Sequence, residues 1–291
     1  MTALEDKIIL VTGATGKQGG ATARNLIKAG VKVRALTRKP DSNSANTLRA
    51  LGIDVVKGNL NDINSLDMAM QGVYGVFSMT NFWEFGTGKK EVIQNKNLTD
   101  IAKKHGVQHF VFASIARCDD NPNLAHFVTK YECEKYIQSS GLPYTFLRAV
   151  YFMDNLKPNE QGVTFHWAVL PDILGEKTTL QMISTADIGW FAAKAFINSE
   201  EYLNKTLDIA GDEVTYPQIL EAYKKIFNAE PKKSNVMKFM LMNLMPEIKK
   251  MMNWYREPRF KADIKHLRTI HPSLATIEDY FRQIKGETAG L

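Results

Sequence analysis

The sequence predicts an α/β protein: a doubly wound parallel sheet with a smaller, mostly helical C-terminal lobe. Three observations predict it. Short β-branched segments alternate with longer amphipathic segments through the first 150 residues, which is the pattern of strand–helix–strand units. The strand-like segments read as mostly apolar runs, as expected for strands that are covered on both faces. A glycine-rich turn follows the first of these segments, and right-handed crossovers then favour a Rossmann-type sheet.

Each element of the first part is expected from a local pattern. The expected strands are 7–12, 32–37, 54–57, 73–78, 109–113 and 144–147. The expected helices lie near 17–29, 44–51, 62–71, 89–105 and 127–140. We place one domain over residues 1–150 and a smaller lobe over 151–291, interleaved with it and with a soft boundary.

The alternation breaks down after residue 150. Short strands are expected at 163–167, 179–183 and 206–210, and a Ser-Thr-Ala-Asp capping box opens a helix over 184–198. From residue 216 onward the pattern predicts helices only, near 216–228, 236–244, 246–255, 261–269 and 275–285. These helices make up most of the expected second lobe, which we place on the substrate side of the sheet.

The composition excludes several classes of protein. With 44% hydrophobic and 23% charged residues, the chain is neither disordered nor of low complexity. Its two cysteines, Cys118 and Cys133, make no disulfide framework and fit a reducing compartment. Glu5 and Asp6 precede only a short apolar run, so no signal peptide is predicted. We expect a cytoplasmic protein, or a nuclear one in a eukaryotic cell, without a membrane partner.

The charge balance is mildly basic. Lys and Arg number 37 against 31 Asp and Glu, a net charge of +6, and the lysine pairs are scattered along the chain. A nucleic-acid-binding protein usually concentrates its charge on one stripe or helix. The balance therefore does not favour a nucleic-acid partner, and an anionic small ligand explains a local excess equally well.

The strongest motif is the turn after the first strand, where Gly13, Gly16 and Gly19 stand at GxxGxxG spacing between a strand and a helix. Glycine is needed in such a turn because the chain bends sharply, a pyrophosphate approaches the backbone, and the helix packs closely on the sheet. The helix N-terminus adds free N–H groups for the phosphates. This context predicts a dinucleotide site, and the spacing is typical of short-chain dehydrogenases.

The end of the second strand selects the dinucleotide. An NAD site places Asp or Glu there to accept hydrogen bonds from the ribose, whereas this strand ends in Thr37-Arg38-Lys39. A carboxylate repels a 2′-phosphate, and the planar guanidinium of Arg38 can bind it through two hydrogen bonds. The sequence therefore favours NADP over NAD.

These and further motifs resemble the NmrA-like family of atypical short-chain dehydrogenases over nearly the whole length. The Thr-Asn-Phe-Trp-Glu stretch is the most specific, and it is similar to the branch that contains an NADPH-sensing, redox-responsive protein. The motifs are Val11-Thr-Gly-Ala-Thr-Gly-Lys-Gln-Gly-Gly20, Val33-Arg-Ala-Leu-Thr-Arg38, Gly58-Asn-Leu-Asn-Asp62, Thr80-Asn-Phe-Trp-Glu84, His126-Phe-Val-Thr-Lys130, Tyr151-Phe-Met-Asp-Asn155 and Asp187-Ile-Gly189.

The resemblance implies a role for each matching position. The glycine turn holds the pyrophosphate, the end of the second strand the 2′-phosphate, and the segment after the third strand the adenine. The segment after the fourth strand lines the ribose and nicotinamide, a later lysine reaches the nicotinamide ribose, and a loop closes over the ring. In this order the residues are Gly13, Thr15, Gly16, Lys17, Gln18 and Gly19; Thr37, Arg38 and Lys39; Asn59 and Leu60; Thr80, Asn81 and Phe82; Lys130; and Phe152 with Asn155. The family usually has an acid where Asn59 stands, but an amide can still bond to adenine.

The catalytic residues are less defined. Short-chain dehydrogenases generally use Ser, Tyr and Lys, in which the lysine helps the phenol to exchange a proton with the substrate. Ser114, Tyr131 and Lys135 offer these side chains, although roughly one Tyr-x-x-x-Lys is expected by chance here. Lys130 points about 100° away from Tyr131 on a helix. We therefore prefer Lys130 as the candidate catalytic residue and keep Tyr131 as the alternative.

Two functional hypotheses follow. The first is an NADP(H)-binding sensor of cofactor redox state that regulates a protein partner. The alternative is an NADPH-dependent oxidoreductase that reduces a small quinone or carbonyl substrate, because a bound cofactor supplies the hydride chemistry. A nucleotide-sugar epimerase is a weaker third. No metal site is expected, and a redox role for Cys133 and a homodimer stay open.

Overall fold

A computed structural model describes the chain except for residues 1–3, 5, 85–87, 121–122, 161 and 290–291. The chain divides into two compact units. The first consists of residues 1–148 and 185–207, and the second of residues 149–184 and 208–291. Among the described residues, no helix combines the length and the apolar character needed to cross a membrane.

The main sheet has seven strands in the order β3-β2-β1-β4-β5-β6-β9. Strands β1 and β2, β2 and β3, β1 and β4, and β4 and β5 pair in parallel. The chain runs outward from β1 to β3 and then returns to β4 on the other side of β1, so the sheet is doubly wound, as predicted. In such sheets ligands bind beyond the carboxyl ends of the strands at this reversal. The strands are β1 (Ile8–Val11), β2 (Lys32–Thr37), β3 (Asp54–Lys57), β4 (Val73–Ser78), β5 (His109–Ile115), β6 (Tyr144–Ala149) and β9 (Lys205–Ile209).

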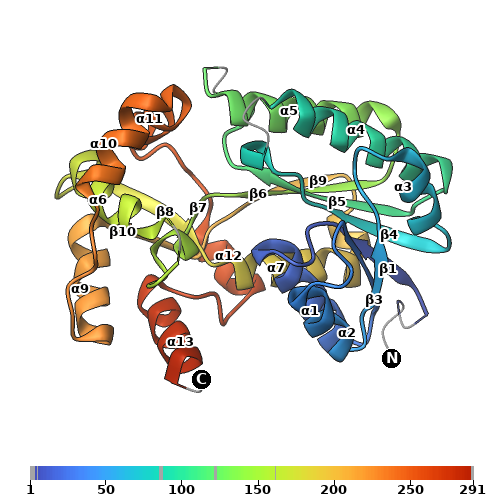
Figure 1. Ribbon diagram of the computed structural model, residues 1–291, viewed down its shortest axis with the longest axis horizontal. Coiled ribbons are helices and arrows are strands. Elements are labelled where there is room, and N and C mark those ends of the chain that lie inside the picture. Colours follow the sequence, from blue (N-terminus) through green and yellow to red (C-terminus); the bar gives the residue numbers. More distant parts are fainter. Residues whose placement is uncertain (1–3, 5, 85–87, 121–122, 161, 290–291) are drawn as a thin grey trace. The chain divides into compact units, whose positions relative to one another are not determined.

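Helices cover both faces of this sheet, as Figure 1 shows. One face carries α1 (Lys17–Lys28), α2 (Asn43–Ala50) and α7 (Thr185–Ile197). The other face carries α3 (Ile63–Ala69), α4 (Lys89–Lys104) and α5 (Ala125–Ser140). Two short helical segments, η1 (Phe82–Glu84) and α8 (Ser199–Tyr202), complete the unit.

The contact between α1 and α7 is unusually close. A Cβ atom on Gly189 of α7 would lie 2.5 Å from the backbone carbon of Ala21 and 2.7 Å from the backbone nitrogen of Thr22. Real Cβ atoms do not approach backbone atoms that closely, so only glycine allows α7 to lie this near to α1. The helix that follows the glycine turn is therefore held in place by a segment from much later in the chain.

The second unit is built around a small three-stranded sheet in the order β10-β8-β7. β8 pairs antiparallel with β10 and parallel with β7. The strands are β7 (Tyr151–Phe152), β8 (Thr179–Ile183) and β10 (Asp212–Thr215). The helices are η2 (Met153–Leu156), α6 (Val163–Leu174), α9 (Tyr216–Phe227), α10 (Asn235–Leu244), α11 (Pro246–Trp254), α12 (Ile264–Ile270) and α13 (Ile277–Ala289).

One predicted strand in this unit is wrong. Residues 163–167, expected as a strand, begin the helix α6. Val163, Phe165 and Trp167 alternate with partly exposed residues, which imitates a strand, but the helix continues into the buried Ala168 and Val169. A helix that is apolar on most sides gives no clear period, and its burial overrides the β-propensity of its first turn.

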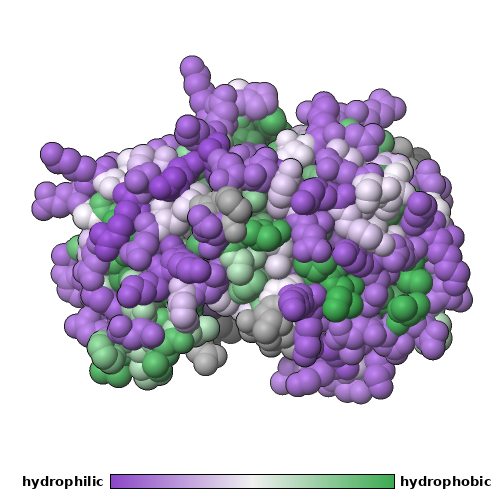
Figure 2. Space-filling view, turned by 90° about the horizontal axis from the view of Figure 1, so that it is seen from above, coloured by the Kyte–Doolittle hydropathy of each residue, from purple (hydrophilic) through white to green (hydrophobic). Residues whose placement is uncertain are grey.

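Large apolar side chains are exposed on α10. Val236, Phe239 and Leu244 are each at least 70% exposed, although α10 packs against α6 and α11. In the view of Figure 2, hydrophobic residues lie in separate patches among hydrophilic ones. The methionine-rich segment of the second unit is therefore partly a surface feature.

Candidate functional site: a nucleotide pocket beside a buried lysine

The glycine turn has the geometry that its motif predicts. Gly13, two residues after the end of β1, has a φ of 62°, which favours glycine. A Cβ atom on Gly19 would lie 2.4 Å from the Gly13 carbonyl oxygen. Gly16 is the N-cap of α1 and its N–H donates to the Gly13 carbonyl over 2.9 Å. The backbone of this turn can therefore be approached closely by a phosphate group at the start of α1.

The end of β2 supplies cations and hydroxyl groups. Arg38 and Lys39 are exposed there, and the Lys39 N–H donates to the Thr37 hydroxyl over 3.2 Å. Ser42 is the N-cap of α2, where its Oγ accepts from the Ala45 N–H over 3.3 Å. Cationic side chains and hydroxyl groups can donate hydrogen bonds to phosphate oxygens, so this corner of the pocket is suited to a phosphate ester.

The segment after β3 forms a further wall. The Asn59 N–H donates to Ser65 Oγ over 3.0 Å, and Asn59 Oδ1 accepts from the Asn61 N–H over 3.1 Å. The Leu60 carbonyl accepts from the Asn97 side chain over 2.9 Å. These bonds fix the segment that is predicted to flank the adenine.

A threonine joins the ends of the two central strands. The Thr12 hydroxyl donates to the Met79 carbonyl over 3.0 Å and accepts from the Met79 N–H over 2.7 Å. This exchange fixes the chain just before Thr80 and Asn81, which follow β4. The Asn81 side-chain oxygen accepts from the Trp83 N–H over 3.0 Å. The region predicted to meet the ribose is thus tied to the glycine turn.

These segments line one pocket of about 380 Å³. Among its described lining residues there is no carboxylate, while Arg38 and Lys39 contribute cations. Ten of the predicted cofactor residues line it: Gly13, Thr15, Gly16, Thr37, Arg38, Lys39, Asn59, Leu60, Thr80 and Asn81. The remaining lining residues were not predicted: Thr12, Leu36, Ser42, Ser44, Gly58, Met79 and Gln94.

Other predicted residues lie elsewhere in the described structure. Lys17, Gln18 and Gly19 form the first turn of α1 and are not among the lining residues. The same holds for Phe82, which is buried against the rings of Trp83 and His126. Phe152 and Asn155 belong to the second unit, and their role at the nicotinamide ring stays a prediction.

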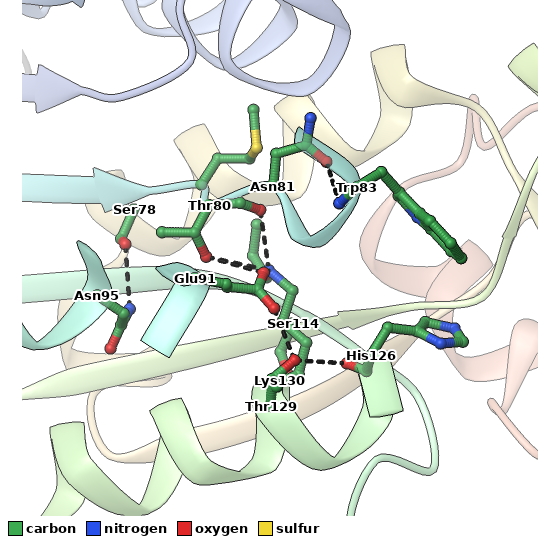
Figure 3. A network of polar contacts seen from close by, with 12 residues as sticks. Ser78, Thr80, Asn81, Trp83, Glu91, Asn95, Ser114, His126, Thr129 and Lys130 are labelled. Atoms are coloured by element: carbon green, nitrogen blue, oxygen red, sulfur yellow. Dashed lines mark hydrogen bonds and ion pairs between the residues drawn. The ribbon is translucent and has the colours of Figure 1, made fainter. Parts of the chain in front are cut away.

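Lys130 lies beside the pocket. Its Nζ donates to the carbonyls of Thr80 over 3.2 Å and Ala113 over 3.1 Å, and it makes an ion pair of 3.0 Å with Glu91 Oε1. Nζ also lies 4.9 Å from the centre of the Phe112 ring. Figure 3 shows Lys130, Thr80 and Glu91 pointing toward one another. Lys130 therefore contacts a residue that lines the pocket, at the carboxyl ends of β4 and β5.

Ser114 and Tyr131 have different partners from those of a dehydrogenase triad. The Ser114 hydroxyl donates to Glu134 Oε1 over 2.5 Å. The Lys135 Nζ lies 4.8 Å from the centre of the Tyr131 ring, so these two side chains contact each other. Ser114 is thus hydrogen-bonded to Glu134, and the catalytic role of Tyr131 stays a prediction.

The cysteines are buried and free. Burial raises the pKa of the Cys133 thiol, the Glu91 charge raises it further, and the nearby Lys130 ammonium offsets only part of this. Burial likewise raises the pKa of the Cys118 thiol. A raised pKa favours the protonated thiol over the reactive thiolate. In the described part of the chain, no group of three or more His, Cys, Asp and Glu could hold a metal ion.

The unpredicted lining residues differ in the signal they give. Ser42 and Ser44 come three and five residues after Lys39, so two hydroxyl groups close to two cations could have been added to the predicted phosphate site. Gln94, which lines the pocket, and Glu91, which does not, lie on α4 and carry no motif. Their position depends on how α4 packs, which no local pattern of residues specifies.

Comparisons with known proteins agree with this architecture. Residues 5–281 match the NmrA-like family. A relative from Penicillium ochrochloron, an NmrA-like family domain-containing oxidoreductase, is 27% identical over 76% of this chain and 73% of its own. The chain spans about half the length of several other curated relatives that it matches.

Solved structures share the fold. An NADPH-dependent quinone oxidoreductase from Escherichia coli, complexed with NADPH, is similar with a TM-score of 0.75 and 23% identity, over 95% of this chain and 99% of that one. NmrA, a negative transcriptional regulator in complex with NADP, is similar with a TM-score of 0.76 and 20% identity, over 98% of both chains. The two neighbours thus bind the nucleotide that the sequence predicts here. With a family match over almost its full length, this chain belongs to the NmrA-like family.

Proposed function

We propose that this protein is an NADPH-dependent oxidoreductase that reduces a small acceptor such as a quinone or a carbonyl compound. The observation that carries the proposal is the corner of the pocket at the end of β2. Arg38, Lys39, Ser42 and Ser44 line it, and no described lining residue is acidic. Such a corner suits a 2′-phosphate, which distinguishes NADP from NAD.

The remaining walls of the pocket fit the rest of a dinucleotide. A Cβ atom on Gly19 would meet the backbone of Gly13, so this glycine allows the close helix packing that the third glycine of a dinucleotide-binding turn provides. Asn59 and Leu60, which are predicted to flank the adenine, line the same pocket as Thr80 and Asn81, which are predicted to line the ribose and nicotinamide side. Curated relatives with similar sequences are named oxidoreductases, which supports a redox role.

The chain's own contribution to the reaction is mainly binding and orientation. Bound NADPH would supply a hydride to the acceptor. Lys130 places a positive charge next to Thr80 at the edge of the pocket, where it can attract a ribose hydroxyl or an oxygen on which negative charge develops. No tyrosine is assigned a proton-transfer step in this proposal.

The test is turnover. NADPH oxidation by the full chain is followed with a panel of quinones and small carbonyl compounds, for the wild type, Lys130→Ala and Tyr131→Phe. We expect turnover with at least one acceptor, a large loss in Lys130→Ala and little change in Tyr131→Phe. Tight NADPH binding without turnover of any acceptor would contradict an enzymatic role.

One observation favours a second candidate. The Ser114 hydroxyl donates to Glu134, so its proton is engaged by a carboxylate, whereas the serine of a short-chain dehydrogenase acts together with a tyrosine. A protein that binds NADP(H) without using it would fit a sensor of the NADPH-sensing branch that regulates a partner. Binding without turnover in the experiment above would support this candidate.

A further inference from the structure

Glu91 is a buried carboxylate next to the pocket. It lies in the first turn of α4, and its side chain is 0% exposed. Oε1 accepts from the Thr80 hydroxyl over 3.1 Å, and Oε2 accepts from the Thr129 hydroxyl over 2.7 Å. Oε1 also forms an ion pair with Lys130. Both oxygens are thus satisfied, as a carboxylate removed from water requires.

The contacts of Lys130 account for all of its donors. An ammonium has three N–H bonds, and Nζ has three groups of partners: Glu91, the Ala113 carbonyl and Thr80. The Lys130 side chain is only 13% exposed. Of these three partners only Thr80 lines the pocket, so a ligand hydroxyl that bonds to Nζ would have to take the place of Thr80.

Thr80 connects this arrangement to the pocket. Its hydroxyl donates to Glu91 and lies 3.4 Å from Lys130 Nζ, and Thr80 lines the pocket whereas Glu91 does not. Figure 3 shows the Glu91 carboxylate next to both side chains. Any effect of Glu91 on a bound ligand must then pass through Lys130 and Thr80.

We propose that Glu91 is a positioning residue for the nicotinamide half of the cofactor: it holds the Lys130 ammonium and the Thr80 hydroxyl at the carboxyl ends of β4 and β5, so that both are oriented before NADPH binds. This inference rests on the proposed nucleotide site. It adds a carboxylate, far from Lys130 in the sequence, as the group that determines where that lysine points.

A purely structural role for Glu91 is the competing explanation. A carboxylate in the first turn of a helix is stabilised by the free N–H groups there, and Glu91 could serve α4 alone. The test must therefore separate an effect on one half of the ligand from an effect on the whole fold.

The experiment uses the full chain and two probes, NADPH and 2′,5′-ADP, which lacks the nicotinamide half. Affinities are measured for the wild type and Glu91→Gln. We expect Glu91→Gln to weaken NADPH binding about tenfold and to change 2′,5′-ADP binding by less than about twofold. Equal weakening of both probes, or no weakening of NADPH, would overturn the inference.

A double-mutant cycle gives a second readout. If Glu91 acts through Lys130, Glu91→Gln added to Lys130→Met changes NADPH affinity by less than about twofold, although alone it costs about tenfold. Additive losses would overturn the inference. The double variant also avoids leaving an unpaired ammonium buried.

Thr129→Val is the milder variant if Glu91→Gln does not fold. It removes one hydrogen bond to Glu91 Oε2 and keeps the charge pair. We expect about threefold weaker NADPH binding with unchanged 2′,5′-ADP binding, and unchanged binding of both would count against Glu91. If the wild type binds neither probe, the proposed function itself fails. If the wild type binds both probes and the Glu91 variant binds them equally well, only the inference about Glu91 fails.

Discussion

Helix α5 carries two buried ion pairs one turn apart, and they are built differently. Lys130 meets Glu91 and shares its remaining donors with two strand-end carbonyls beside the pocket. Glu134 meets Arg148 through two hydrogen bonds, from Nε over 2.9 Å and from Nη2 over 2.6 Å. The first pair contains an ammonium that bonds to Thr80, which lines the pocket, and the second contains a planar guanidinium held by two carboxylates.

Lys130 can exchange one of its partners for a ligand, whereas Arg148 cannot. Arg148 also binds Asp119 over 2.8 Å, and Glu134 also accepts from Ser114. Burial lowers the pKa of Arg148, but the hydrogen bonds and charge of Glu134 more than offset this and raise it above its usual range. We infer that the Glu134 pair stabilises the fold, whereas the Glu91 pair serves the ligand.

The largest expected effect comes from breaking the Glu134 pair. Arg148→Met leaves Glu134 buried without its counter-charge, so the free energy of unfolding should fall by about 3–5 kcal/mol. Urea unfolding measures this change. NADPH affinity of the folded variant should stay near that of the wild type, and a loss of stability below about 1 kcal/mol would contradict the contrast between the two pairs.

His109 is a buried base whose pKa is shifted by burial alone, so it makes the stability of the fold depend on pH. The ring of His109 lies 2.7 Å from the Thr145 hydroxyl, and burial lowers its pKa to about 4. Below about pH 6.5 His109 binds a proton in the unfolded chain but stays neutral in the folded chain. The free energy of unfolding therefore falls as the pH drops from about 6.5 to 4, by up to about 3 kcal/mol. Urea unfolding of the wild type and His109→Gln across this range should diverge, and parallel pH curves would show that His109 does not contribute.

An exposed cation provides the next contrast. Arg38 stands at the pocket edge, so its loss should affect the ligand with little effect on stability. Arg38→Ala should weaken NADPH binding about 10- to 100-fold and NADH binding by less than about twofold. Fluorescence titration of both nucleotides measures this ratio. Equal weakening of NADPH and NADH binding would show that the 2′-phosphate binds elsewhere. Lys39→Ala is the matched control, for which we expect a smaller loss of NADPH affinity.

The smallest effect is expected at Tyr131. Its ring contacts Lys135 on the helix surface, and the side chain is partly exposed. Tyr131→Phe keeps this ring contact and should change turnover and NADPH affinity by less than about twofold. A loss of turnover of about 100-fold in steady-state kinetics would restore the dehydrogenase triad as the catalytic centre.

The fold was predictable wherever the pattern was local. The central strands β1, β4 and β5 are mostly apolar, and the glycine turn marks the first crossover. The sheet and the glycine-rich wall of the pocket could therefore be predicted from neighbouring residues. β10 was missed because Asp212 and Glu213 are polar in a strand of only four residues. The α6 helix was missed because aromatic and β-branched residues at its start imitate a strand.

The site was predictable only in part, for a related reason. Arg38 and the glycines lie next to the strands that position them, and their chemistry is visible in sequence. Glu91 and Glu134 act through partners that tertiary packing brings from other elements. Sequence spacing placed Ser114, Tyr131 and Lys135 in one arrangement, but the buried Glu134 offers Ser114 a charged acceptor, which is a stronger partner than a phenol.

The close contact of Gly189 with Ala21 has a practical consequence for dissecting the protein. A truncation after residue 150 would keep every strand and loop of the nucleotide pocket but would remove α7, and with it the cover of α1. The apolar side of α1 would then face water, and the turn that it anchors would lose its support. An isolated nucleotide-binding fragment therefore has to include residues 185–207, joined to the N-terminal part by a short artificial linker.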